Sequence, residues 1–127
     1  MREPIMLVIE NDPERLRDAR EFIGKVFAEW GLDAETARLC VSELAGNAMT
    51  HTASATITVR AFLTERGPVI EVFDDSPALP VVHAFDCDSE SGRGLAMLEL
   101  MTVSLGWRPV APRGKCVHAL LGRAEPF

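Results

Sequence analysis

The stretch VSELAGNAMTH, Val41–His51, combines an apolar helix with three regularly spaced polar residues. Glu43, Asn47 and His51 follow one another at intervals of four, so on a helix of 3.6 residues per turn they share one stripe. The apolar residues beside them form an adjacent stripe that is typical of a core face: Ala37, Val41, Leu44 and Ala48. The polar side chains therefore lie along the edge of the buried face, where a helix borders a cleft. A binding site and a coincidence of spacing are both compatible with so short a motif.

Length and composition predict one globular domain over residues 1–127. Hydrophobic residues make up 47% of the chain and charged residues 25%, which are ordinary values for a globular protein. No apolar run approaches the roughly 20 residues that span a bilayer. The short run Ile5–Ile9 is not followed by the small-residue cleavage site of a signal peptide. We therefore expect a cytoplasmic protein that does not contact a membrane.

Charge and cysteine content exclude two further classes of protein. The formal net charge of −6 argues against a nucleic-acid-binding surface, which would show a basic patch. Cys40, Cys87 and Cys116 are widely spaced and form no C-x-x-C pair, so free thiols are expected in a reducing compartment. A zinc site would have to combine Cys87 and Cys116 with His83 and His118, whose spacing is not typical of zinc ligands.

The predicted elements follow the order helix, helix, hairpin, loop, helix, hairpin. A capping side chain and an early proline predict a first helix from about Pro13 to Trp30, ended by Gly31. The second helix begins near Asp33 or Ala34 and carries the polar stripe. Strands are expected over five ranges: Ile5–Ile9, Ala55–Leu63, Val69–Phe73, Val103–Pro109 and Lys115–Leu121.

A long loop and a third helix separate the two predicted hairpins. Residues Pro77–Ser91 contain several turn signals and read as a loop, after which Gly92-Arg93-Gly94 opens a helix over about Gly94–Met101. Helices gathered on one face of a sheet give an α+β, two-layer α/β sandwich. We expect three main helices on a mixed, mainly antiparallel sheet.

Four segments in a fixed order carry residues suited to binding. They are the helix with Glu43 and Asn47, then DDSPALP (Asp74–Pro80), GRGLAM (Gly92–Met97) and GKCVHALL (Gly114–Leu121). Their order and spacing resemble the Bergerat-fold ATP-binding superfamily, which joins DNA gyrase, the mismatch-repair ATPases, histidine kinases and a heat-shock chaperone. Within it, the chain looks most like the single-domain anti-sigma-factor serine/threonine kinases of actinomycetes. The resemblance covers nearly the whole chain and implies the Bergerat fold.

The resemblance implies a role for three of these residues. Glu43 matches the general base, which accepts a proton from the hydroxyl group that attacks the γ-phosphate. Asn47 matches the asparagine whose side-chain oxygen binds Mg²⁺ beside the phosphates. Asp74 matches the aspartate that accepts a hydrogen bond from the exocyclic amine of adenine, which distinguishes adenine from guanine. The alternatives are a hydrogen bond at the helix edge for the first two and a turn-forming Asp for the third.

The glycine-rich segments imply the remaining ATP contacts. The usual D-x-G-x-G of the superfamily is Asp74-Asp75-Ser76-Pro77-Ala78 here, so Ser76 and Ala78 stand where glycines give backbone freedom. The other expected contacts are Gly92, Arg93, Gly94 and Leu95 at a helix start that attracts anions, and Gly114 at the last strand. We expect Asp75 to be exposed, Lys115 to be solvated, and His51 to cap or pack near its helix end.

The resemblance also implies cofactors and partners, namely ATP, Mg²⁺ and two kinds of protein. Kinases of this family phosphorylate a small STAS-type antagonist protein on serine or threonine and bind a sigma factor, so phosphorylation decides which partner is held. Such a protein regulates transcription without contacting nucleic acid and usually forms a homodimer. The alternative is an ATP-binding module that switches partners without phosphotransfer. Glu43 favours the kinase, whereas Ser76 and Ala78, which replace glycines, leave the binding module as an alternative.

Overall fold

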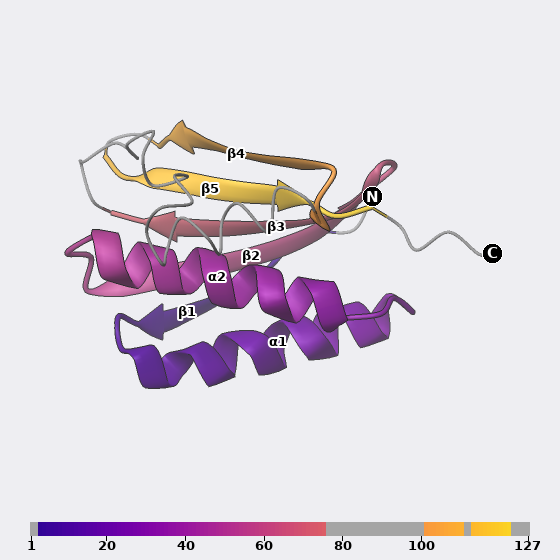
Figure 1. The fold of residues 1–127 in the computed structure, drawn as a ribbon, viewed down its shortest axis with the longest axis horizontal. Coiled ribbons are helices and arrows are strands. Elements are labelled where there is room, and N and C mark those ends of the chain that lie inside the picture. The colour runs from indigo at the N-terminus through magenta and orange to yellow at the C-terminus, as the bar shows by residue number, and fades with distance from the viewer. Residues whose placement is uncertain (1–2, 76–100, 111–112, 123–127) are drawn as a thin grey trace.

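The protein folds as a two-layer sandwich in which helices cover one face of an antiparallel sheet (Figure 1). The structure is a computed structural model that describes residues 3–75, 101–110 and 113–122. The described elements are β1 (Ile5–Glu10), η1 (Pro13–Arg15), α1 (Leu16–Glu29), α2 (Glu35–His51), β2 (Thr56–Thr64), β3 (Gly67–Asp74), β4 (Ser104–Pro109) and β5 (Lys115–Leu120). The predicted α+β class and two-layer architecture are confirmed.

The sheet has the strand order β1-β2-β3-β5-β4, and each neighbouring pair in it is antiparallel. The prediction of a mixed, mainly antiparallel sheet is thus met by antiparallel pairs alone in the described part of the chain. Both predicted hairpins are present, β2–β3 and β4–β5. The third helix, expected over about Gly94–Met101, lies almost wholly outside the described residues, which contain two α-helices.

Local signals set the ends of the first helical segment. The Asp12 carboxylate accepts a hydrogen bond from the Glu14 N–H at 3.0 Å, and Pro13 begins the 3-10 turn η1 that leads into α1. At the other end Gly31 has a φ of +73°, which only glycine adopts readily, and the Leu32 N–H donates to the Phe27 carbonyl at 2.9 Å. The predicted span is confirmed, with a 3-10 first turn in place of a regular α-helical one.

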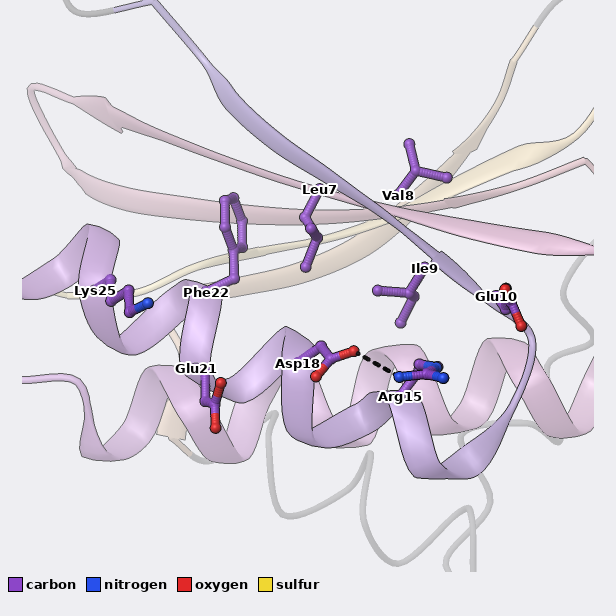
Figure 2. Close-up of a pocket in the computed structure, with 9 residues that line it drawn as sticks. All are labelled: Leu7, Val8, Ile9, Glu10, Arg15, Asp18, Glu21, Phe22 and Lys25. Carbon is purple, nitrogen blue, oxygen red and sulfur yellow. Dashed lines mark hydrogen bonds and ion pairs between the residues drawn. The ribbon is translucent and has the colours of Figure 1, made fainter.

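The hydrophobic core lies between the helices and the sheet. The predicted core stripe of α2 is buried, and Ile57, Val59 and Ala61 of β2 are fully buried under the helices. Strand β1 alternates in the same way, because Leu7 and Ile9 point toward α1 whereas Val8 points to the opposite side (Figure 2). The alternation of period two therefore assigns one sheet face to the core.

We predict that two valine substitutions on adjacent strands differ in their effect on stability. Val59→Ala deletes fully buried methyl groups and should lower the free energy of unfolding by about 2–3 kcal/mol. Val8→Ala lies on the exposed side of β1, where Val8 is 57% exposed, and should cost less than about 1 kcal/mol. Urea unfolding of both variants measures the difference. Equal losses would contradict the assignment of the core face.

Candidate functional site

The C-terminal end of α2, the end of β3 and the start of β5 lie at the same end of the sandwich (left in Figure 1). The loop after α2 is tied to β3 by Ser54, whose buried hydroxyl accepts a hydrogen bond from the Asp75 N–H at 2.9 Å. The Ser54 carbonyl in turn accepts a hydrogen bond from the Asn11 side chain at 2.7 Å. Sequence reasoning missed Ser54, because a lone serine in a loop gives no signal of what it will anchor.

Helix α2 carries Asn47, a buried acceptor for which the described part of the chain offers no donor. The Asn47 Oδ1 atom is buried and accepts no hydrogen bond from any residue that the structure describes. An orphaned buried acceptor costs free energy, so native proteins rarely keep one unless a ligand, an ion or water completes it. Asn47 thus has the property that a ligand-binding side chain needs.

Glu43 lies one turn before Asn47 on the same half-buried edge of α2. Burial and then the nearby Glu43 carboxylate raise the pKa of the Cys40 thiol to about 12, which keeps this thiol protonated. His51 is the last residue of α2 and is exposed. Of the polar stripe, Glu43 and Asn47 therefore border the core and His51 does not.

Asp74 is a buried carboxylate that pairs with a buried lysine. The Lys115 Nζ atom lies 3.0 Å from Asp74 Oδ2 and 3.2 Å from Oδ1, and both residues are less than 10% exposed. Our expectation that Lys115 is solvated was wrong. The antiparallel register places Lys115 directly opposite Asp74, and Lys115 shares the helix-facing side of β5 with the core residues Val117 and Ala119. The sequence holds no local signal of this pairing, because it depends on which strand lies next to β3.

Gly114 allows the start of β5 to pack against the end of β3. Its φ of +111° is unfavourable for other residues, and a Cβ atom here would overlap the Asp74 carbonyl oxygen. The same atom would lie 3.1 Å from the Asp75 Cα. Gly114 thus lies in close contact with the backbone of Asp74 and Asp75, and its expected contact with ATP stays a prediction. Asp75 itself is exposed, as predicted.

Six of the ten predicted site residues fall outside the described part of the chain: Ser76, Ala78, Gly92, Arg93, Gly94 and Leu95. The other four are Glu43, Asn47, Asp74 and Gly114. The structure brings Asp74 and Gly114 into contact and places Glu43 and Asn47 on consecutive turns of α2.

A second buried carboxylate, Glu71, lies on the sheet face that points away from the helices. It accepts hydrogen bonds from Arg60 Nε at 2.6 Å and from Arg108 Nη1 at 2.9 Å, and the hydrogen bond to Glu71 raises the pKa of Arg108. Burial, followed by the Glu71 charge, raises the pKa of the Cys116 thiol to about 12. The Arg60 guanidinium also lies over the Phe73 ring at 5.1 Å. These contacts tie β2, β3, β4 and β5 together, and none involves a predicted site residue.

A surface groove between β1 and α1 is likewise separate from the candidate site (Figure 2). Its lining mixes both signs of charge, and the ion pair in it, Arg15–Asp18, is solvent-exposed with an N–O distance of 3.4 Å. Exposed pairs of this kind contribute little to stability. Within residues 3–75, 101–110 and 113–122, no group of three or more His, Cys, Asp or Glu side chains is placed to hold a metal, and Cys40 and Cys116 are free thiols as predicted.

We predict that alanine is tolerated worse at Gly114 than at Gly31. Both glycines have a positive φ, but a Cβ at Gly31 would meet no atom within 4 Å. Gly31→Ala should therefore cost only the strain of the left-handed backbone, about 1–2 kcal/mol. Gly114→Ala adds the overlap with Asp74 and should cost more. Chemical denaturation compares the two variants, and a smaller loss for Gly114→Ala would show that β5 does not press on Asp74.

Comparison with known proteins identifies the family. The family model of the histidine kinase-like ATPase domain matches residues 9–120, which span β2, β3 and both α-helices in full. No curated protein matches the chain. No helix in the described ranges is long and apolar enough to cross a membrane. The antiparallel sheet covered by α1 and α2 is compatible with this match, and the chain belongs to the histidine kinase-like ATPase domain family, a family of ATP-binding domains.

Proposed function

We propose that this protein is a Mg-ATP-dependent serine/threonine protein kinase that phosphorylates a small STAS-type antagonist protein. Its further proposed partners are a sigma factor and a second copy of the chain, so that phosphorylation would switch the sigma factor between bound and free states. The family match supports ATP binding by a kinase-like ATPase domain. The observation that carries the proposal to this chain is the buried Oδ1 atom of Asn47, which accepts no hydrogen bond from the described residues.

Asn47 fits a magnesium-bound nucleotide. Mg²⁺ prefers oxygen ligands and shares its coordination shell with phosphate groups and a few protein oxygens. The neutral amide oxygen of Asn47 has no donor among the described residues and is suited to such a shell, because contact with the ion would offset the free-energy cost of burying the acceptor. When bound, the ion would neutralise charge on the phosphates. Asn47 would hold the nucleotide through this ion.

Asp74 fits the adenine end of the nucleotide. Its carboxylate is buried at the end of β3 and pairs with Lys115. The backbone around it is held by the close approach of Gly114 and by the hydrogen bond from the Asp75 N–H to Ser54. A carboxylate only accepts hydrogen bonds, so it suits the 6-amine of adenine and opposes the 6-carbonyl of guanine. Asp74 would therefore select the base.

Glu43 fits the role of general base. It lies one helical turn from Asn47 and is half-buried, so a substrate hydroxyl beside the γ-phosphate would come within its reach. Phosphoryl transfer has a loose transition state, in which positioning and charge neutralisation contribute more than proton removal. The glutamate would accept the proton of the attacking serine or threonine, while Asn47 would help to position the phosphate.

We predict that Asn47→Ala weakens ATP binding mainly when magnesium is present, because the side chain acts through the ion. Titration calorimetry with ATP, in magnesium and again in a chelator, measures both affinities. His51→Ala, on the same stripe of α2 but exposed, is the matched control and should bind as the wild type does. Equal losses in the two conditions would mean that Asn47 has a structural role.

We predict that Glu43→Gln retains ATP binding while phosphotransfer falls by roughly 100-fold, because the amide cannot accept the proton. Glutamine has the same size as glutamate, so the variant should fold normally. Unchanged nucleotide affinity would confirm that it does. The assay follows labelled phosphate from ATP to the cognate antagonist protein. Glu35→Gln, in the exposed first turn of α2, is the control for the same substitution.

Two outcomes of that assay count against the proposal. Transfer at the wild-type rate by Glu43→Gln would remove Glu43 as the base. A wild-type protein that binds ATP and the antagonist without transferring phosphate would support the ATP-binding partner switch, which Ser76 and Ala78 keep open as the second candidate.

A further inference from the structure

The ion pair between Asp74 and Lys115 places a donor and an acceptor side by side. The Nζ atom contacts both carboxylate oxygens, at 3.0 and 3.2 Å, so any group that approaches Asp74 also meets the lysine ammonium. Both side chains are nearly inaccessible to water, with an exposed fraction of 8% for Lys115 and 1% for Asp74. A buried pair of this kind must be well satisfied by its partners to be retained.

The position of the pair is fixed by the backbone. Asp74 and Lys115 are register partners across β3 and β5, and Gly114 fixes the start of β5 against the Asp74 carbonyl. The hydrogen bond from the Asp75 N–H to Ser54 fixes the end of β3 from the other side. Because the end of β3 and the start of β5 are both held in place, the fold determines where the acceptor Asp74 and the donor Lys115 lie relative to each other.

The Watson–Crick edge of adenine carries the complementary pattern. Its 6-amine is a donor and the adjacent N1 atom is an acceptor, whereas guanine carries an acceptor at position 6 and a donor at N1. We propose that Lys115 is a base-reading residue that donates to adenine N1 while Asp74 accepts from the 6-amine. Guanine would then meet two mismatches in place of one. This inference rests on the proposed role of Asp74 in binding adenine.

The chemistry of the ammonium group allows this second contact. A base that reaches Asp74 would bring the acceptor N1 to Lys115, whose ammonium group can donate three hydrogen bonds. Sites that hydrogen-bond a substrate group reject analogues that lack the group far better than apolar pockets reject a missing methylene. Two polar contacts at one edge of the base are thus an effective source of selectivity.

The experiment compares three nucleotides by calorimetric titration of the wild-type protein. They are ATP, 1-deaza-ATP, which has a C–H group in place of N1, and purine riboside triphosphate, which lacks the 6-amine. We expect each analogue to bind at least about tenfold more weakly than ATP, since each lacks one of the two proposed hydrogen bonds between the base and the pair. This comparison requires no substitution and does not depend on the folding of a variant.

The second arm uses Lys115→Met, which should bind ATP and 1-deaza-ATP equally while still preferring ATP to purine riboside triphosphate. Lys25→Met, an exposed lysine of α1, is the matched control and should behave as the wild type does. Removing Lys115 leaves Asp74 buried without its counter-charge, so thermal unfolding is measured alongside. The variant Asp74→Leu/Lys115→Met, which removes both charges together with the acceptor and the donor, should prefer ATP over neither analogue.

The titrations distinguish an error in the role of Lys115 from an error in the proposed adenine site. Equal wild-type affinity for ATP and 1-deaza-ATP, with purine riboside triphosphate still bound weakly, would overturn the role of Lys115 and leave Asp74 in place. Equal affinity for all three nucleotides, or no ATP binding, would overturn the proposed adenine site itself. A loss in Lys115→Met that is the same for ATP and 1-deaza-ATP and disappears with adenosine would instead make Lys115 a phosphate contact.

Discussion

The antiparallel pairing of β3 with β5 determines where the charged groups of the candidate site lie. This pairing places Asp74 opposite Lys115 and brings Gly114 onto the backbone of Asp74. A shift of one residue would turn Lys115 to the other sheet face, since side chains alternate with a period of two. The buried Asp74 carboxylate would then lose the counter-charge of Lys115, which is costly in a protein interior. The site and the sheet are therefore stabilised by the same contacts.

The same alternation separates two buried acidic groups that are only three residues apart. Asp74 is on the helix-facing side of β3, whereas Glu71 is on the opposite side with Arg60 and Arg108. Two cations saturate Glu71, and aromatic rings flank its arginines. Asp74 pairs with Lys115 of β5 and is the last residue of β3. Glu71 therefore joins the strands within the sheet, whereas Asp74 lies at the sheet end where the proposed nucleotide would bind.

One face of helix α2 packs in the core, and its edge contributes residues to the candidate site. Its small and aliphatic residues are buried under the sheet, which fixes the rotation of the helix about its own axis. That rotation brings the Asn47 side-chain oxygen into a buried position where the described residues offer it no donor. Proteins commonly tolerate an unfavourable feature at a functional site, such as an unsatisfied acceptor, when the packing of the rest of the fold stabilises the structure. The orphaned acceptor is therefore a consequence of packing that a ligand would relieve.

The sequence by itself determined most of the fold. Periodicities of 3.6 and two predicted both α-helices and the strands, because they depend on local geometry and on which side chains avoid water. The cap at Asp12 and the positive φ at Gly31 were also local, so the ends of the first helix could be predicted. Order and spacing of four segments indicated the ATP-binding family, and the family match over residues 9–120 confirms it.

Only the tertiary structure decided what the charged and polar groups of the site touch. Lys115 follows a turn and looks like a solvated residue in sequence, yet it is buried because β5 inserts between β3 and β4. Ser54 acquires its role from a hydrogen bond to Asp75, 21 positions away. Neither contact is encoded by neighbouring residues, since each depends on the order of strands in the sheet and on the register between them. Local pattern thus determined the elements, and the pairing of distant strands determined the environment of Asp74.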